Sequence, residues 1–126
     1  MPIDQAEVVE IVRRSLDEDM LESAIVLWDR SPRVEGESVR IARATHAMPF
    51  DGTIVFADLA PRANWAHPCV YLLIADDGID ARMLRASFPP FRGEPPASYV
   101  EILRNGEVLN SPNQHRSYDE QGGEES

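Results

Sequence analysis

The stretch CVYLLIADDGIDARMLRA, residues 69–86, decides the fold of this chain. Residues 70–74 are apolar at every position, and an apolar run without alternation is typical of a strand buried on both faces of a sheet. Asp77-Gly78 follows, and this pair favours the tight turn of a β-hairpin. We therefore predict a central strand at 69–75 that turns into a second strand at 79–86.

Three further strands are predicted before this hairpin. They lie at residues 24–28, 39–45 and 53–59, where branched and aromatic residues are frequent. The segment Asp-Arg-Ser-Pro at 29–32 has the composition of a turn and should end the first of these strands. With the hairpin, they make an antiparallel sheet of about five strands.

Residues 97–109 allow two interpretations. A hairpin fits, with strands at 99–104 and 107–109, a turn at Asn105-Gly106, and Arg104 opposite Glu107. A short helix also fits, because Pro96 suits a helix start and Asn105-Gly106 suits a helix end. The hairpin is the favoured interpretation.

A helix is predicted at the beginning of the chain. Asp4 and Glu7 have the spacing of a capping box, and Ile3 and Val8 have that of a hydrophobic staple. One face carries apolar residues at helical spacing, namely Val9, Val12, Leu16 and Met20. Three acids at 17–19 oppose the helix dipole and should mark its end. This apolar face is expected to pack on the sheet.

These elements predict an α+β fold: an N-terminal amphipathic helix packed on an antiparallel sheet. The 126 residues are enough for one domain, which we expect over residues 1–109. Residues 110–126 are polar and end in acids, so we expect a disordered acidic tail there.

The charge of the chain limits its partners. A formal net charge of −10 repels phosphate groups, which disfavours binding to nucleic acid and to anionic membranes. It suits a protein partner with a basic surface. All 12 basic residues are arginine, so lysine-based covalent chemistry is excluded. The longest uncharged apolar run, 69–75, is too short to span a bilayer, and residues 1–20 lack a signal-peptide pattern, so a cytoplasmic location is expected.

The first candidate site surrounds the single cysteine. Cys69 follows His67 by two positions, so their side chains would share a face of an extended chain, and Asp58 is close in sequence. An imidazole beside a thiol lowers the pKa of the thiol and makes it a nucleophile. A buried thiol at the start of a core strand is the favoured alternative. With His46 and either Asp51 or Asp58, His67 and Cys69 could also hold a metal, but nothing in the spacing requires one; we predict no metal and no cofactor.

The second candidate site is a binding surface made of aromatic residues and arginines. Trp65 lies with Asn64 and Arg62 on a loop between two prolines, and Phe91 and Arg92 lie in the proline-rich segment 88–96. Aromatic side chains and arginine are the residue types most often found at the centre of protein interfaces. Trp28 and Phe88 either belong to the same aromatic patch or lie in the core, and for Trp28 the core is the favoured interpretation.

Two function classes follow from these patterns. The favoured one is a small, acidic, non-catalytic accessory or interaction protein that acts through a protein partner. The alternative is a small cysteine-dependent enzyme that uses Cys69 with His67.

Overall fold

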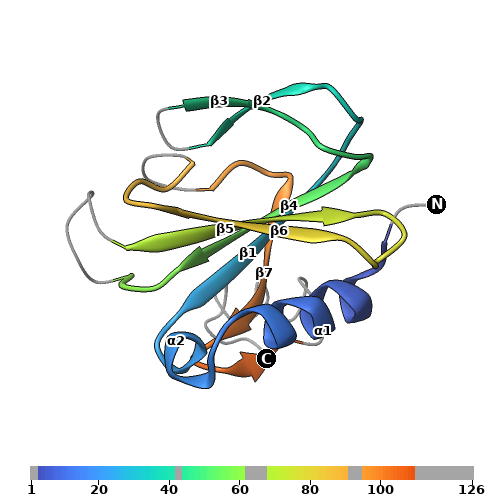
Figure 1. Cartoon of the computed structure of the whole chain (residues 1–126). Coiled ribbons are helices and arrows are strands. Elements are labelled where there is room, and N and C mark those ends of the chain that lie inside the picture. The colour runs from blue at the N-terminus through green and yellow to red at the C-terminus, as the bar shows by residue number, and fades with distance from the viewer. Residues whose placement is uncertain (1–2, 42–43, 62–67, 91–94, 110–126) are drawn as a thin grey trace.

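A six-stranded antiparallel sheet forms the middle layer of the molecule, between a helical layer and a separate β-hairpin (Figure 1). The computed structural model describes residues 3–41, 44–61, 68–90 and 95–109. The helices are α1 (Gln5–Ser15) and α2 (Glu18–Glu22). The strands are β1 (Ile25–Arg33), β2 (Ser38–Ile41), β3 (Ala44–Ala47), β4 (Gly52–Asp58), β5 (Cys69–Ala75), β6 (Ala81–Ala86), β7 (Tyr99–Arg104) and β8 (Glu107–Val108). The order in the large sheet is β6-β5-β4-β1-β7-β8, which confirms the predicted α+β class.

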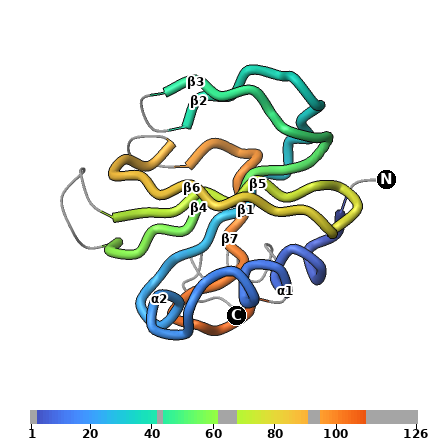
Figure 2. Tube along the Cα trace, in the orientation of Figure 1, coloured from blue at the N-terminus to red at the C-terminus, as the bar shows by residue number. Residues whose placement is uncertain are grey.

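Each face of the large sheet has its own apolar core. Alternate residues of β5 point to opposite faces. Val70, Leu72 and Ile74 pack with the buried face of α1, whereas Tyr71 and Leu73 pack with the hairpin β2–β3. The Cα trace shows α1 and this hairpin on opposite sides of the sheet (Figure 2). All seven residues of β5 are buried, as predicted for a central strand.

The capping box at the start of α1 is confirmed. The side chain of Asp4 accepts a hydrogen bond from the backbone N–H of Glu7 at 2.9 Å, and the Glu7 side chain accepts one from the N–H of Asp4. The predicted length is wrong, because α1 ends at Ser15 and a second helix begins at Glu18. Acids destabilise the C-terminal end of a helix and stabilise the N-terminal end, so those at 17–19 suit a new helix better than a continued one.

The first predicted turn is part of a strand. β1 continues through residues 29–32 to Arg33, and a bulge absorbs the turn-like sequence. The five residues of β1 from Asp29 to Arg33 face only the three residues of β4 from Ile54 to Gly52. Asp29 stabilises the bulge by accepting a hydrogen bond from the N–H of Ser31 at 3.0 Å. A bulge can hold a proline such as Pro32 because one of its residues needs no ladder hydrogen bond.

The predicted strand at 39–45 is also wrong, because the chain reverses there. β2 and β3 pair antiparallel, with Ile41 opposite Ala44. Val39 and Ile41 are buried against the large sheet, whereas β3 is mostly exposed.

The favoured hairpin at 99–108 is confirmed. It adds β7 and β8 to the large sheet, whereas the predicted strand at 39–45 lies outside this sheet, so the total is six strands. Arg104 lies opposite Glu107 in the register, as predicted. Asn105 and Gly106 both have positive φ angles, 54° and 84°, as the mirror-image turn of a two-residue hairpin requires. The guanidinium of Arg104 itself pairs with Glu101 on the same strand.

Candidate functional site

The predicted thiol site lies at the first residue of β5. Cys69 is 2% exposed and faces Asp58 of β4 in the strand register. Its Sγ atom lies 3.4 Å from the carbonyl oxygen of Phe88, which also accepts a hydrogen bond of 2.7 Å from the hydroxyl of Tyr71. The thiol and the phenol together hold the segment after β6 against the sheet.

This environment favours the neutral form of the thiol. Burial, and after it the carboxylate of Asp58, raise the pKa of Cys69 to about 11, against a smaller opposite effect of the hydrogen bond to Phe88. A nucleophilic cysteine needs the opposite shift, because the thiolate is the reactive form. At neutral pH, Cys69 is therefore a buried, protonated side chain.

The structure brings only two of the predicted site residues together, Cys69 and Asp58. The others, Arg62, Asn64, Trp65, His67, Phe91 and Arg92, lie outside the described residues. Among the residues that are described, no group of three or more His, Cys, Asp and Glu side chains is close enough to hold a metal ion.

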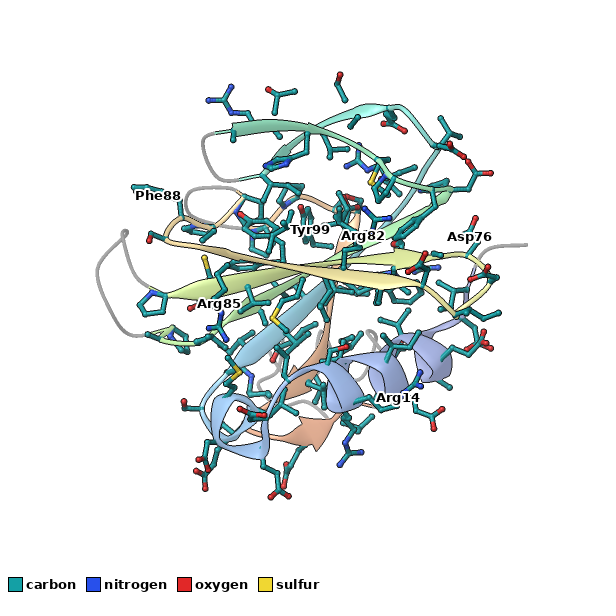
Figure 3. The ribbon with its side chains drawn as sticks, in the orientation of Figure 1. Arg14, Asp76, Arg82, Arg85, Phe88 and Tyr99 are labelled. Atoms are coloured by element: carbon teal, nitrogen blue, oxygen red, sulfur yellow. The ribbon has the colours of Figure 1, made fainter. Side chains whose placement is uncertain are left out.

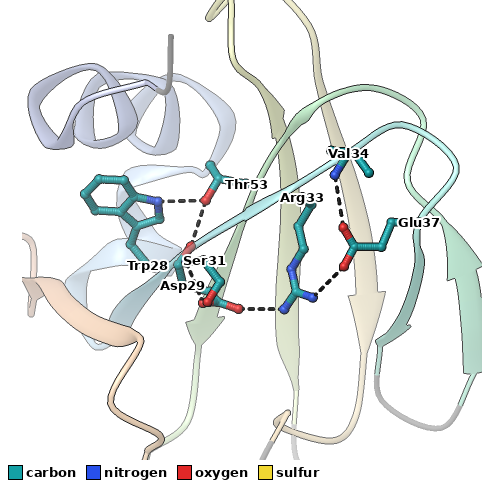
Figure 4. Close-up of polar contacts among 7 residues, drawn as sticks. All are labelled: Trp28, Asp29, Ser31, Arg33, Val34, Glu37 and Thr53. Atoms are coloured by element: carbon teal, nitrogen blue, oxygen red, sulfur yellow. Dashed lines mark hydrogen bonds and ion pairs between the residues drawn. The ribbon is translucent and has the colours of Figure 1, made fainter.

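A partly buried ionic network is a second polar site, and the sequence analysis missed it (Figure 4). Arg33 lies between two carboxylates: Nη2 is 2.9 Å from Asp29, and Nη1 is 3.1 Å from Glu37. Glu37 also accepts a hydrogen bond from the N–H of Val34 at 3.0 Å, and this bond and Arg33 lower the pKa of Glu37. The network joins the bulge of β1 to the segment before β2. Each carboxylate already has its partner, so we assign the network a structural role.

Trp28 and Thr53 extend this polar site into the core. The indole Nε1 of Trp28 donates a 2.8 Å hydrogen bond to the Thr53 hydroxyl, which donates one of 2.7 Å to the backbone carbonyl of Asp29. The expected core position of Trp28 is confirmed, and its polar atom is satisfied.

A third feature is an open hollow of about 590 Å³ between α2 and the ends of β1, β4 and β7. Its lining residues include Glu22, Ser23, Leu59 and Arg104. Among its described lining residues, the one basic side chain is Arg104, which is already paired with Glu101.

The fourth feature is the outer edge of the sheet at β6. β6 pairs with β5 on one side, and no strand of the described residues pairs with its other side. The N–H of Ala75 bonds to the carbonyl of Asp80, which identifies 75/80 as a hydrogen-bonded pair. Hydrogen-bonded and non-bonded pairs alternate along an antiparallel ladder. In this register the backbone groups of Arg82 and Leu84 therefore bond to β5.

The alternate residues of β6 present their backbone outward. These are Ala81, Met83 and Arg85, and each offers one N–H and one C=O at the edge. The opposite edge of β5 supports this assignment. There the N–H of Asp76 donates a hydrogen bond to the carbonyl of Asp51, next to β4, so even-numbered residues bond toward β4 and odd-numbered ones toward β6. The register between β5 and β6 has no shift, so the outer edge is regular along its whole length.

Most side chains along this edge are exposed, and two of them are basic. Ile79 is 86% exposed and Met83 is 40% exposed. Arg82 and Arg85 are also exposed, and neither forms an ion pair within the described part of the chain (Figure 3). The Arg82 guanidinium lies 5.9 Å from the centre of the Phe50 ring, a contact that positions it.

No family model, no curated protein and no solved structure matches this chain. Within the described residues, no helix is both long and apolar enough to cross a bilayer. The functional argument therefore depends on the geometry of the chain itself.

Proposed function

We propose that this chain is a non-catalytic interaction protein that binds a protein partner by strand addition at the outer edge of β6. One observation carries this proposal: a regular six-residue edge strand is left open, with its outward N–H and C=O groups unpaired among the described residues. Such an edge is a template for an extended segment of another chain, because main-chain hydrogen bonds continue the sheet.

The edge lacks two common protections against strand addition. β6 holds no proline, and it has no bulge that would twist it away from a partner. Exposed Met83 lies at its centre and supplies apolar surface next to the outward N–H. The neighbouring strand β5 also gives β6 a firm support, because all seven of its residues are buried.

The alternative function, a cysteine-dependent enzyme, gains no support from the described residues. It needs a reactive thiolate at Cys69, whose pKa is raised rather than lowered. His67 lies outside the described residues, so the Cys69–His67 pair stays a prediction. The cytoplasmic location also stays a prediction from the sequence.

Strand addition is tested with short extended peptides as probes and with one pair of variants. The probes are fluorescent TEVVET, TQVVQT and TKVVKT, and binding is measured by polarisation at low salt. Met83→Pro removes an outward N–H without removing a hydrogen bond to β5, whereas Met83→Ala removes the same side chain and keeps that N–H.

We expect at least one peptide to bind the native chain, to bind the Met83→Ala variant, and to lose binding to the Met83→Pro variant. The proposal is contradicted if none of the three peptides binds, or if the proline variant binds as well as the alanine variant.

A further inference from the structure

We infer that the strand added to β6 comes from an acidic partner segment and carries two carboxylates three residues apart, with apolar residues between them. This inference rests on the proposed strand addition and names the chemistry of the partner. Its basis is the placement of Arg82 and Arg85 on β6, three positions apart.

Residues three positions apart on a strand point to opposite faces of the sheet. Arg82 lies opposite Leu73, on the face that packs against the β2–β3 hairpin. Arg85 lies opposite Val70, on the face that packs against α1. An added strand therefore meets one guanidinium on each face. Only acids with the same spacing of three can meet both.

The two positions between the arginines favour apolar residues in the partner. Met83 is exposed on the helix face, and Leu84 is half-buried on the hairpin face, where it packs against the core. Directly opposed apolar side chains stabilise neighbouring strands. The pattern acid-apolar-apolar-acid reads the same in both directions, so it fits a parallel or an antiparallel partner strand.

Charges at the start of β6 fix the register of the added strand. The turn before β6 carries Asp76, Asp77 and Asp80. Slipping the partner by two residues toward this turn keeps its side chains on the same faces, but moves an acid from Arg82 to a position opposite Asp80. Like charges directly opposite one another are unfavourable, so the arginine register is preferred.

The local charge also argues against a second copy of this chain as the occupant. Pairing β6 with another β6 would gather four arginines along one seam, whereas an acidic strand neutralises them. The net charge of −10 favours a basic partner at long range, but contacts within a Debye length are decided by the nearest groups. At this edge the nearest exposed charges on the strand are positive.

The experiment compares four peptides: TEVVET, its neutral analogue TQVVQT, its basic analogue TKVVKT, and TEVEVT. The last has the same composition as the first but places its acids two residues apart, so both lie on one face. Two exposed ion pairs should make TEVVET bind about five-fold more tightly than TQVVQT. TKVVKT should bind more weakly than TQVVQT, and TEVEVT should lose about half of the gain in binding free energy, a two-fold effect.

The matching variants are Arg82→Gln, Arg85→Gln and a control, Arg40→Gln. Arg40 is an exposed arginine on β2, and its replacement changes the net charge by the same amount. We expect each β6 variant to weaken TEVVET about two-fold, and the double variant to bind it no better than TQVVQT. The control should behave like the native chain.

Failure of this inference differs from failure of strand addition. If the acidic, neutral and basic peptides bind the native chain equally and all lose binding to the Met83→Pro variant, the acidic partner is contradicted but strand addition is not. A peptide-free dimer that the Met83→Pro substitution abolishes would make a second copy the occupant and also overturn the inference. A weakening by Arg40→Gln as large as that by Arg85→Gln would assign the effect to net charge.

Discussion

At the scale of single residues, Cys69 has the least ambiguous environment. The apolar run that follows it made burial the favoured prediction, and the thiol is buried beside the carbonyl of Phe88. Burial away from solvent, and after it the carboxylate of Asp58, hold the thiol in its neutral form by raising its pKa.

We therefore expect Cys69 to resist alkylation in the native state. Iodoacetamide at pH 7.5 should leave the folded chain unmodified over hours and label it fully in denaturant, as mass spectrometry would show. Rapid native labelling that slows when His67 is replaced by alanine would contradict this and support the cysteine-enzyme alternative.

The buried Cys69 and the partly buried Tyr99 predict loss of stability at alkaline pH. Burial raises the pKa of Tyr99 to about 12, and that of Cys69 is raised to about 11. Both groups bind their protons more tightly in the folded state, so their contribution is complete at neutral pH. It is lost as the pH rises above the pKa values of the unfolded chain, from about 9 upward.

Urea unfolding between pH 7 and pH 11 measures this loss. The free energy of unfolding should fall above pH 9, and less steeply in the Tyr99→Phe variant, which cannot ionise. Equal slopes for the two chains would show that Tyr99 does not contribute.

Other residue-level features could not be foreseen. Asp29, Arg33 and Glu37 are spaced by four, which in a sequence suggests neighbours on a helix. Here the same residues meet because a strand bulge and a turn bring them together. Only the three-dimensional path of β1 shows that contact.

At the scale of elements, the sequence predicted those with strong local signals. The capping box located the start of α1, the Asn-Gly pair located the turn of the last hairpin, and the apolar run identified β5 as interior. The hairpin β2–β3 was missed because residues 42–43 are Ala-Arg, which carry no turn signal. Its reversal depends instead on burying Val39 and Ile41 against the large sheet.

The alternation along β6 predicts that proline destabilises the fold much less at one position than at the position next to it. Met83→Pro should lower the free energy of unfolding only slightly, because its N–H points away from β5. Arg82→Pro removes a ladder N–H and leaves a carbonyl of β5 unpaired, which should cost about 1–3 kcal/mol. Chemical denaturation measures both, with Met83→Ala and Arg82→Ala as side-chain controls. If Met83→Pro lowers the free energy of unfolding more than Arg82→Pro does, the N–H of Met83, and not that of Arg82, is the one that bonds to β5.

At the scale of the whole molecule, charge and exposure single out one edge. Acids outnumber basic residues by 22 to 12, yet the open strand β6 carries two exposed arginines. The expected tail at 110–126 and the predicted aromatic loop lie outside the described residues, so they stay predictions. The sequence predicted an interaction protein from its composition, but it could not identify the edge, because strand order is set by the packing of distant segments.

Amide hydrogen exchange, followed residue by residue by NMR, tests strand addition most directly. In the free chain, the outward amides of Met83 and Arg85 should exchange fast, while those of Arg82 and Leu84, bonded to β5, exchange slowly. Adding TEVVET should slow Met83 and Arg85 strongly and leave the rest of the chain nearly unchanged. Protection that appears elsewhere, or no change at Met83 and Arg85 when the peptide is bound, would contradict strand addition at β6.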